Sequence, residues 1–140
     1  MTAKEFLRRA RNVDRRVDEA TERVDRLRAK LEAGRMSRIT GMPRGGGEDW
    51  TATADKLIEL EKRVNARIRE MCRLKRLAQE AIDQVDDMRL REVLELYYID
   101  GFTWEQVAQR MGITERWALI LHGRALLRVK VPKEIQENSL

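Results

Sequence analysis

Hydrophobic residues in the first part of the chain recur every three or four positions. Between residues 4 and 33 these steps alternate four and three without a break, and nearly every other residue there is charged. The stripe consists of Phe6, Ala10, Val13, Val17, Ala20, Val24, Leu27 and Leu31. A seven-residue repeat of this kind places one narrow apolar seam along a helix. The pattern therefore predicts one long amphipathic helix that ends at Gly34, a residue typical of helix ends.

A second stripe of the same kind covers residues 55–85, and Arg67 interrupts it. Its main positions are Leu57, Leu60, Val64, Ile68, Met71, Leu74, Ala78, Ala81, Ile82 and Val85. Phe6 to Leu31 and Leu57 to Ile82 each correspond to roughly 37 Å of helix. Residues 34–53 lie between them and contain Gly41-Met42-Pro43 and Gly45-Gly46-Gly47, which break helices. Two helices of equal length joined by a flexible loop predict an antiparallel, coiled-coil-like hairpin.

The charges on the first helix favour pairing within the chain. A parallel pair of two copies would place Arg23 near Arg28 of the second copy, whereas Glu59, Glu61 and Glu70 of the second helix offset the basic edge. Two helices with a narrow seam bury little apolar area, so the hairpin needs a further surface to pack on. We therefore expect a homo-oligomer that forms through the N-terminal helices.

After Asp86-Asp87, a pair typical of a helix start, the pattern changes. It predicts a helix to about residue 99, a turn at Asp100-Gly101, and helices at about 104–111 and 115–129. We expect the ordered part of the chain to end at Pro132. The predicted fold is all-α, with three parts: a helical hairpin over residues 1–87, a trihelical domain over 88–131, and a polar tail over 132–140.

The last two predicted helices have the spacing of a helix-turn-helix. Thr103 and Thr114 stand where a hydroxyl caps a helix N-terminus. Gly112 stands where the turn needs a backbone without a Cβ, and Ala108 stands where two helices approach closely. This motif presents its second helix to the major groove of DNA.

Composition narrows the classes of function. The net charge is +5, which suits a polyanionic partner, although the surplus of basic residues lies mainly in residues 1–40. One cysteine, Cys72, and one histidine, His122, exclude a disulfide framework and a zinc cluster. The sequence contains no nucleophile–base pairing and no cofactor loop, so we expect no enzyme and no cofactor. It contains no secretory signal and no membrane-spanning run, so we expect a cytoplasmic protein.

Several short segments carry a resemblance to a known family. Leu96-Tyr97-Tyr98, the stretch from Gly101 to Ala108, Met111-Gly112 and the stretch from Leu121 to Leu126 resemble region four of bacterial sigma factors. That region grips the upstream promoter element. The layout over about residues 5–131 is similar to small phage proteins related to the ArpU and RinA type transcriptional regulators. The resemblance implies a phage- or prophage-encoded regulator that binds double-stranded DNA in the bacterial host cell.

The spacing also assigns positions that face the DNA groove. They are Thr114, Glu115, Arg116, Leu119, Ile120 and Gly123, with Arg124 and Arg128 as further contacts to phosphate. Arg116 lies nearest the start of the presented helix and is the best candidate for a base or phosphate contact. Leu119 and Ile120 depart from the expected polar or basic residues. They can contact a thymine methyl but cannot form hydrogen bonds to base edges.

Three hypotheses therefore remain open. The first is a site-specific DNA-binding regulator of transcription that acts as an oligomer. The second is a DNA-packaging protein similar to a small terminase subunit, although such proteins usually place the DNA-binding part before the oligomerisation part. The third is an interaction module that binds host RNA polymerase through Leu119 and Ile120.

Overall fold

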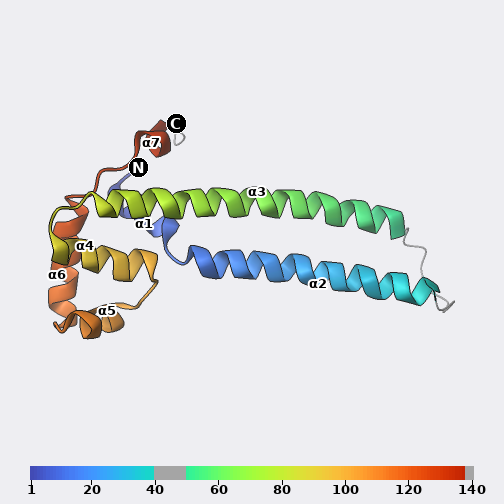
Figure 1. Ribbon diagram of the computed structural model, residues 1–140, viewed down its shortest axis with the longest axis horizontal. Coiled ribbons are helices and arrows are strands. Elements are labelled where there is room, and N and C mark those ends of the chain that lie inside the picture. Colours follow the sequence, from blue (N-terminus) through green and yellow to red (C-terminus); the bar gives the residue numbers. More distant parts are fainter. Residues whose placement is uncertain (40–49, 138–140) are drawn as a thin grey trace. The chain divides into compact units, whose positions relative to one another are not determined.

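The computed structural model describes residues 1–39 and 50–137, and all its elements are helical (Figure 1). They are α1 (Ala3–Ala10), α2 (Val13–Ile39), α3 (Trp50–Asp83), α4 (Met88–Leu94), the π-helical η1 (Glu95–Ile99), α5 (Trp104–Met111), α6 (Glu115–Leu126) and α7 (Lys133–Glu137). The all-α prediction is confirmed. The chain divides into a hairpin unit, Asp14–Glu70, and a C-terminal unit, Met1–Val13 with Met71–Leu140.

In the hairpin unit, α2 and α3 run side by side (Figure 1). Their direction is antiparallel, because residues 27–31 of α2 lie opposite residues 53–63 of α3, while residues 21–28 lie opposite 61–68. Arg28 of α2 forms an ion pair with Glu61 of α3. The predicted hairpin is therefore confirmed, and one of the predicted glutamates meets the basic edge of the first helix.

The first predicted helix is interrupted at Arg11 and Asn12. Asn12 has a φ of 62°, in the left-handed region that asparagine tolerates better than most residues. The helix before the break, α1, buries Phe6 and Leu7 in the core of the C-terminal unit. The apolar spacing continues across the break without a change, and for this reason it predicted a single helix.

The predicted loop over residues 34–53 is helical at both ends. Helix α2 continues through Gly34 to Ile39, and α3 already begins at Trp50. A glycine inside a helix costs only about 1 kcal/mol relative to alanine, which is too little to end a long helix that packs on a neighbour. The part of the predicted loop over residues 40–49 lies outside the described residues.

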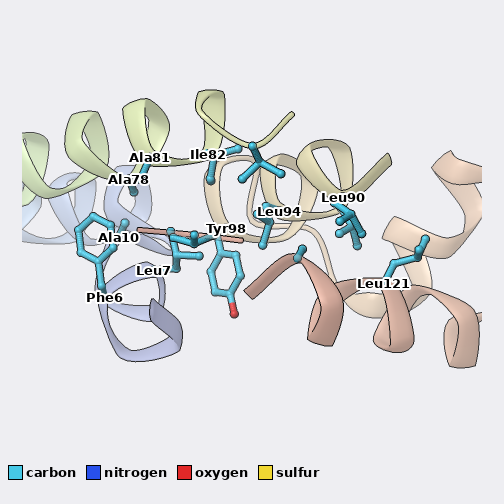
Figure 2. Packing of buried hydrophobic residues seen from close by; sticks show 14 of the residues in the cluster. Phe6, Leu7, Ala10, Ala78, Ala81, Ile82, Leu90, Leu94, Tyr98 and Leu121 are labelled. Carbon is cyan, nitrogen blue, oxygen red and sulfur yellow. The ribbon is translucent and has the colours of Figure 1, made fainter. Parts of the chain in front are cut away.

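The C-terminal unit has one hydrophobic core to which α1, α3, α4, η1, α5 and α6 all contribute (Figure 2). Its largest buried side chains include Tyr98, Phe6, Leu7 and Ile82. The predicted start of α4 is confirmed, since the carboxylate of Asp87 accepts hydrogen bonds from the backbone N–H groups of Arg89 and Leu90. One face of α6 packs on this core, and the packing determines which face of the helix is exposed to solvent.

The end of the chain differs from the expected polar tail. Helix α7 follows Pro132, and Ile135 on it is buried in the core of the C-terminal unit. Arg73 of α3 donates a hydrogen bond to the carboxylate of Glu134, with 3.1 Å between Nη2 and Oε2. A single buried isoleucine gives no periodic signal, so the sequence did not predict this helix. Residues 138–140 lie outside the described part of the chain.

Candidate nucleic-acid interface

Helices α5 and α6 are held in their mutual orientation by capped ends and a glycine turn. The Thr103 hydroxyl accepts a hydrogen bond from the backbone N–H of Gln106, whose side chain accepts one from the Thr103 N–H in return. Gly112 ends α5 with a φ of 67°. The Thr114 hydroxyl then caps α6 by accepting from the backbone N–H of Trp117, at 3.1 Å. Both predicted caps and the predicted turn are confirmed.

One face of α6 packs on the core and the other faces solvent. Ala118, Leu121, His122 and Ala125 are buried. The positions predicted to face DNA all lie outside this face and are exposed; they are Thr114, Glu115, Arg116, Leu119, Ile120, Gly123, Arg124 and Arg128. Arg116, Leu119, Ile120 and Gly123 follow one another at helical spacing, and we call them the α6 outer face. The structure therefore places all the predicted residues at exposed positions of the C-terminal unit.

The α6 outer face presents two apolar side chains to solvent and has free space at Gly123. Leu119 is 48% exposed and Ile120 is 38% exposed. A Cβ added at Gly123 would meet nothing within 4 Å, so the backbone there is open to a close neighbour. Exposed leucine and isoleucine on a presented helix must meet either thymine methyl groups or a protein partner to lose contact with water.

Beside this face, arginines surround a second apolar area. The guanidinium of Arg124 lies 5.3 Å from the centre of the Trp117 ring. Arg128 and Arg89 share with them a hollow of about 370 Å³, and Leu127 at its border is 87% exposed. The hollow thus combines three arginines with apolar side chains, and the carboxylate of Asp87 also lines it. The excess of positive charge suits the phosphate and sugar of a nucleic-acid backbone.

A buried polar pair lies under α6. The Tyr98 hydroxyl and Nε2 of His122 are 2.6 Å apart and share one hydrogen bond. Burial lowers the pKa of His122 from 6.5 to about 4, and the positive charge of Lys4 lowers it further in the same direction. Burial raises the pKa of Tyr98 to about 12. At neutral pH both groups are therefore uncharged.

Sequence reasoning missed the contribution of α1 to this unit. The guanidinium of Arg11 donates hydrogen bonds to the carbonyl oxygens of Tyr97, at 3.0 Å, and Phe102, at 3.1 Å, and it lies 4.0 Å from the centre of the Tyr97 ring. These contacts tie α1 to the turn before α5. Arg11 is one of many arginines in the N-terminal repeat, and no pattern in the sequence distinguishes it from the others.

Two further properties bear on the class of function. Within residues 1–39 and 50–137, no group of histidine, cysteine, aspartate and glutamate side chains is arranged to hold a metal ion. In the same part of the chain, every helix is too short or too polar to cross a membrane.

Comparison with protein families identifies the C-terminal helices. Residues 81–131 match the family model for Sigma-70, region 4, a stretch that includes α4, η1, α5 and α6. The C-terminal helices are therefore similar to the helix-turn-helix of sigma-70 region 4, and the expected resemblance to this region is confirmed. The match covers little more than a third of the chain. Searches of curated proteins and of solved structures gave no match. The resemblance to the ArpU and RinA type phage regulators stays a prediction.

Proposed function

We propose that this protein is a DNA-binding regulator of transcription that places α6 in the major groove of double-stranded DNA. The observation that carries the proposal is that α6, in a region similar to sigma-70 region 4, has one buried face and one exposed face. One face of the helix completes the core, and the residues of the α6 outer face are exposed. Such a domain binds DNA and is not itself catalytic, which supports a non-enzymatic role.

Each exposed residue has a distinct role in this proposal. Arg116 lies in the first turn of α6 and reaches base edges or a phosphate. Gly123 lets the DNA backbone approach closely, because no side chain stands in the way. Arg124 and Arg128 bind phosphates, and Thr114 and Glu115 lie at the helix N-terminus that meets the edge of the groove.

We further propose that the protein acts as an oligomer through the hairpin unit. Leu27, Leu31, Leu57 and Leu60 line an apolar hollow of about 590 Å³ on this unit, and Leu27 remains exposed. A second hairpin of the same kind is the occupant that fits, because it presents the same narrow seam. Light scattering is expected to give a small oligomer that Leu27→Glu weakens. A ring of eight or more subunits would instead favour a role in DNA packaging.

The finer biological class is also part of the proposal. A helical hairpin followed by a sigma-like helix-turn-helix is the layout of the phage regulators that the sequence resembles. We therefore infer that the hairpin unit assembles the protein, that the C-terminal unit binds DNA through its helices over residues 88–131, and that both act in the cytoplasm of a bacterial host.

The test begins with a selection of bound fragments from random genomic duplex DNA. Affinity for an enriched fragment is then measured at two salt concentrations for the wild type and for Arg116→Ala/Arg124→Ala. We expect roughly tenfold or greater loss, because charge-assisted contacts are removed. The matched control, Arg26→Ala/Lys62→Ala, removes the same charge from exposed positions of the hairpin unit and is expected to bind like the wild type. Equal affinity of both double variants would sink the assignment of Arg116 and Arg124.

The exposure of Leu119 and Ile120 also favours a second candidate function, binding to host RNA polymerase. An apolar pair on a presented helix fits a protein surface as well as it fits thymine methyl groups. Capture of polymerase by the wild type and its loss in Leu119→Ser/Ile120→Ser, with the fold retained, would support this candidate. Loss of DNA affinity alone would support the major-groove proposal.

A further inference from the structure

The C-terminal unit contains a hollow of about 410 Å³ whose walls are positively charged and aromatic. Helix α1 supplies Lys4 and Arg8, and its C-cap residue is Arg11; η1 supplies Tyr97, α5 supplies Trp104, and α6 supplies His122. The side chains that line it include no carboxylate. Three cations around one hollow with no acidic group among its walls create a positive potential that attracts an anion.

The positive charge in this hollow is available to a ligand. Lys4 and Arg8 are exposed, and neither forms an ion pair or a hydrogen bond within the described ranges 1–39 and 50–137. Arg11 is held in place by the carbonyl oxygens of Tyr97 and Phe102. Carbonyl oxygens carry only partial charge, so the formal charge of Arg11 also stays uncompensated.

The hollow has a rigid aromatic wall. The rings of Tyr97 and Trp104 stack at 4.0 Å between centres with 12° between their planes. The rings of Trp104 and His122 are 4.7 Å apart. Stacked rings with few rotamers hold a site open without the entropic cost of ordering flexible side chains on binding.

Besides the positive charge of the hollow, the unsatisfied imidazole of His122 is an independent indication of a ligand. It is 9% exposed, and its Nε2 shares a hydrogen bond with the Tyr98 hydroxyl. Its Nδ1 has no hydrogen-bond partner in the described part of the chain. When the Tyr98 hydroxyl donates to Nε2, Nδ1 carries the proton and becomes a buried donor without an acceptor. Buried donors are nearly always satisfied in folded proteins, and an anion in the hollow would satisfy this one.

We propose that this hollow binds a phosphate group, with Lys4 and Arg8 as its charged contacts and His122 as a neutral donor. Leu119 of the α6 outer face also lines the hollow, so the site borders the surface proposed to enter the major groove. The phosphate is then a backbone phosphodiester beside the groove, and in this respect the inference rests on the proposed function. The family match begins at residue 81, so α1 adds this contact to the domain from outside the matched stretch.

The single histidine of the chain makes the site measurable. The titratable groups that face His122 from the packed elements are Lys4 and Arg8 on α1, Arg11 at the C-cap of α1, and the two tyrosines of η1. Burial holds the pKa of His122 down, and the positive charge of Lys4 lowers it further; a phosphate bound next to Lys4 offsets that charge. Binding is therefore expected to shift the imidazole NMR signals of His122 and to raise its pKa above about 4.

The first experiment titrates the full chain with inorganic phosphate at constant ionic strength, with chloride as the reference anion, and follows the His122 signals. We expect a saturable shift in the wild type and in the control Arg26→Ala/Lys62→Ala. We expect none in Lys4→Ala/Arg8→Ala. Both positions of the latter variant are exposed, so the fold is retained, which circular dichroism checks. Because Lys4→Ala changes the His122 signals by itself, each variant is compared with its own chloride titration.

The second experiment repeats the measurement with duplex DNA and determines the dependence of affinity on salt. Loss of one phosphate contact is expected to lower the slope of log affinity against log salt by about 1 in Lys4→Ala/Arg8→Ala and to leave the control unchanged. Affinity at physiological salt is expected to fall roughly tenfold.

The two experiments separate the hollow from the proposed function. DNA binding with the same salt slope in all variants and no shift of His122 would overturn the phosphate site while leaving the regulator proposal intact. A saturable phosphate shift without any DNA binding would support the site as a receptor for a free phosphate compound and would count against the proposed function. No shift with either probe would overturn the inference.

Discussion

Replacement of Tyr98 by phenylalanine tests the buried hydrogen bond under α6. The ring of Tyr98 stays in the core, where only 2% of the residue is exposed, so packing is nearly unchanged. The hydroxyl that lies 2.6 Å from Nε2 of His122 is removed. Because His122 is itself 9% exposed, water has little access to replace that hydroxyl. The variant therefore isolates the cost of leaving one buried polar atom without a partner.

The expected loss follows from this geometry. A buried polar group that loses its partner costs about 1–3 kcal/mol in the free energy of unfolding. The matched control is Tyr97→Phe, since the Tyr97 hydroxyl makes no hydrogen bond among the described residues. Its ring packs on Trp104 and Arg11 in the same way with or without the hydroxyl. We expect Tyr97→Phe to change stability by less than about 0.5 kcal/mol.

Urea denaturation followed by the NMR signal of His122 measures this quantity in the C-terminal unit alone, because the chain has no other histidine. Equal stabilities of Tyr98→Phe and Tyr97→Phe would refute the reasoning. In that case the contact between Tyr98 and His122 would contribute nothing beyond packing, and a buried water or a rearranged imidazole would have replaced it.

Three further predictions follow from the same unit. Because burial lowers the pKa of His122 from 6.5 to about 4, the unfolded chain takes up a proton first, so the free energy of unfolding should fall as pH drops from about 6.5 to 4. The loss is at most about 3 kcal/mol, and a His122→Gln variant with a flat urea midpoint over this range would confirm its source. Gly112→Ala should cost about 1 kcal/mol in thermal unfolding, because a Cβ has free space there but φ is 67°; an unchanged midpoint would contradict the left-handed turn. Arg11→Ala should cost about 2 kcal/mol and speed amide exchange in α1, since three hydrogen bonds to carbonyl oxygens are lost; unchanged exchange in α1 would show that the helix docks without Arg11.

The helix-turn-helix could be predicted from the sequence because local chemistry determines it. Thr103, Gly112 and Thr114 each satisfy a backbone requirement within a few residues of their own position, so the caps and the turn are visible without tertiary contacts. The exposed positions of α6 follow from its 3.6-residue period in the same way. The hairpin was also predictable, because a long apolar repeat requires a partner of equal length.

The parts that the sequence did not predict depend on contacts between distant residues. The break at Asn12 leaves the apolar repeat in phase, and α1 is separate from α2 because it packs on helices more than 60 residues away in the sequence. The same holds for α7, where Ile135 is buried by elements far along the chain. The charged hollow was missed for this reason: Lys4 and Arg8 approach His122 only after α1 has docked.

The central claim is that the α6 outer face enters the DNA groove, and one substitution tests it most directly. Ile120→Glu adds a negative charge in the middle of this face, whereas Ala66→Glu adds the same charge at an exposed position of α3 in the hairpin unit. The measurement is the affinity of both variants and the wild type for an enriched duplex at physiological salt. The account predicts that Ile120→Glu lowers the affinity for DNA roughly tenfold or more, because the negative phosphates of DNA repel the new carboxylate. It predicts near wild-type affinity for Ala66→Glu. Wild-type affinity of Ile120→Glu would contradict the claim and move the DNA contact to another surface.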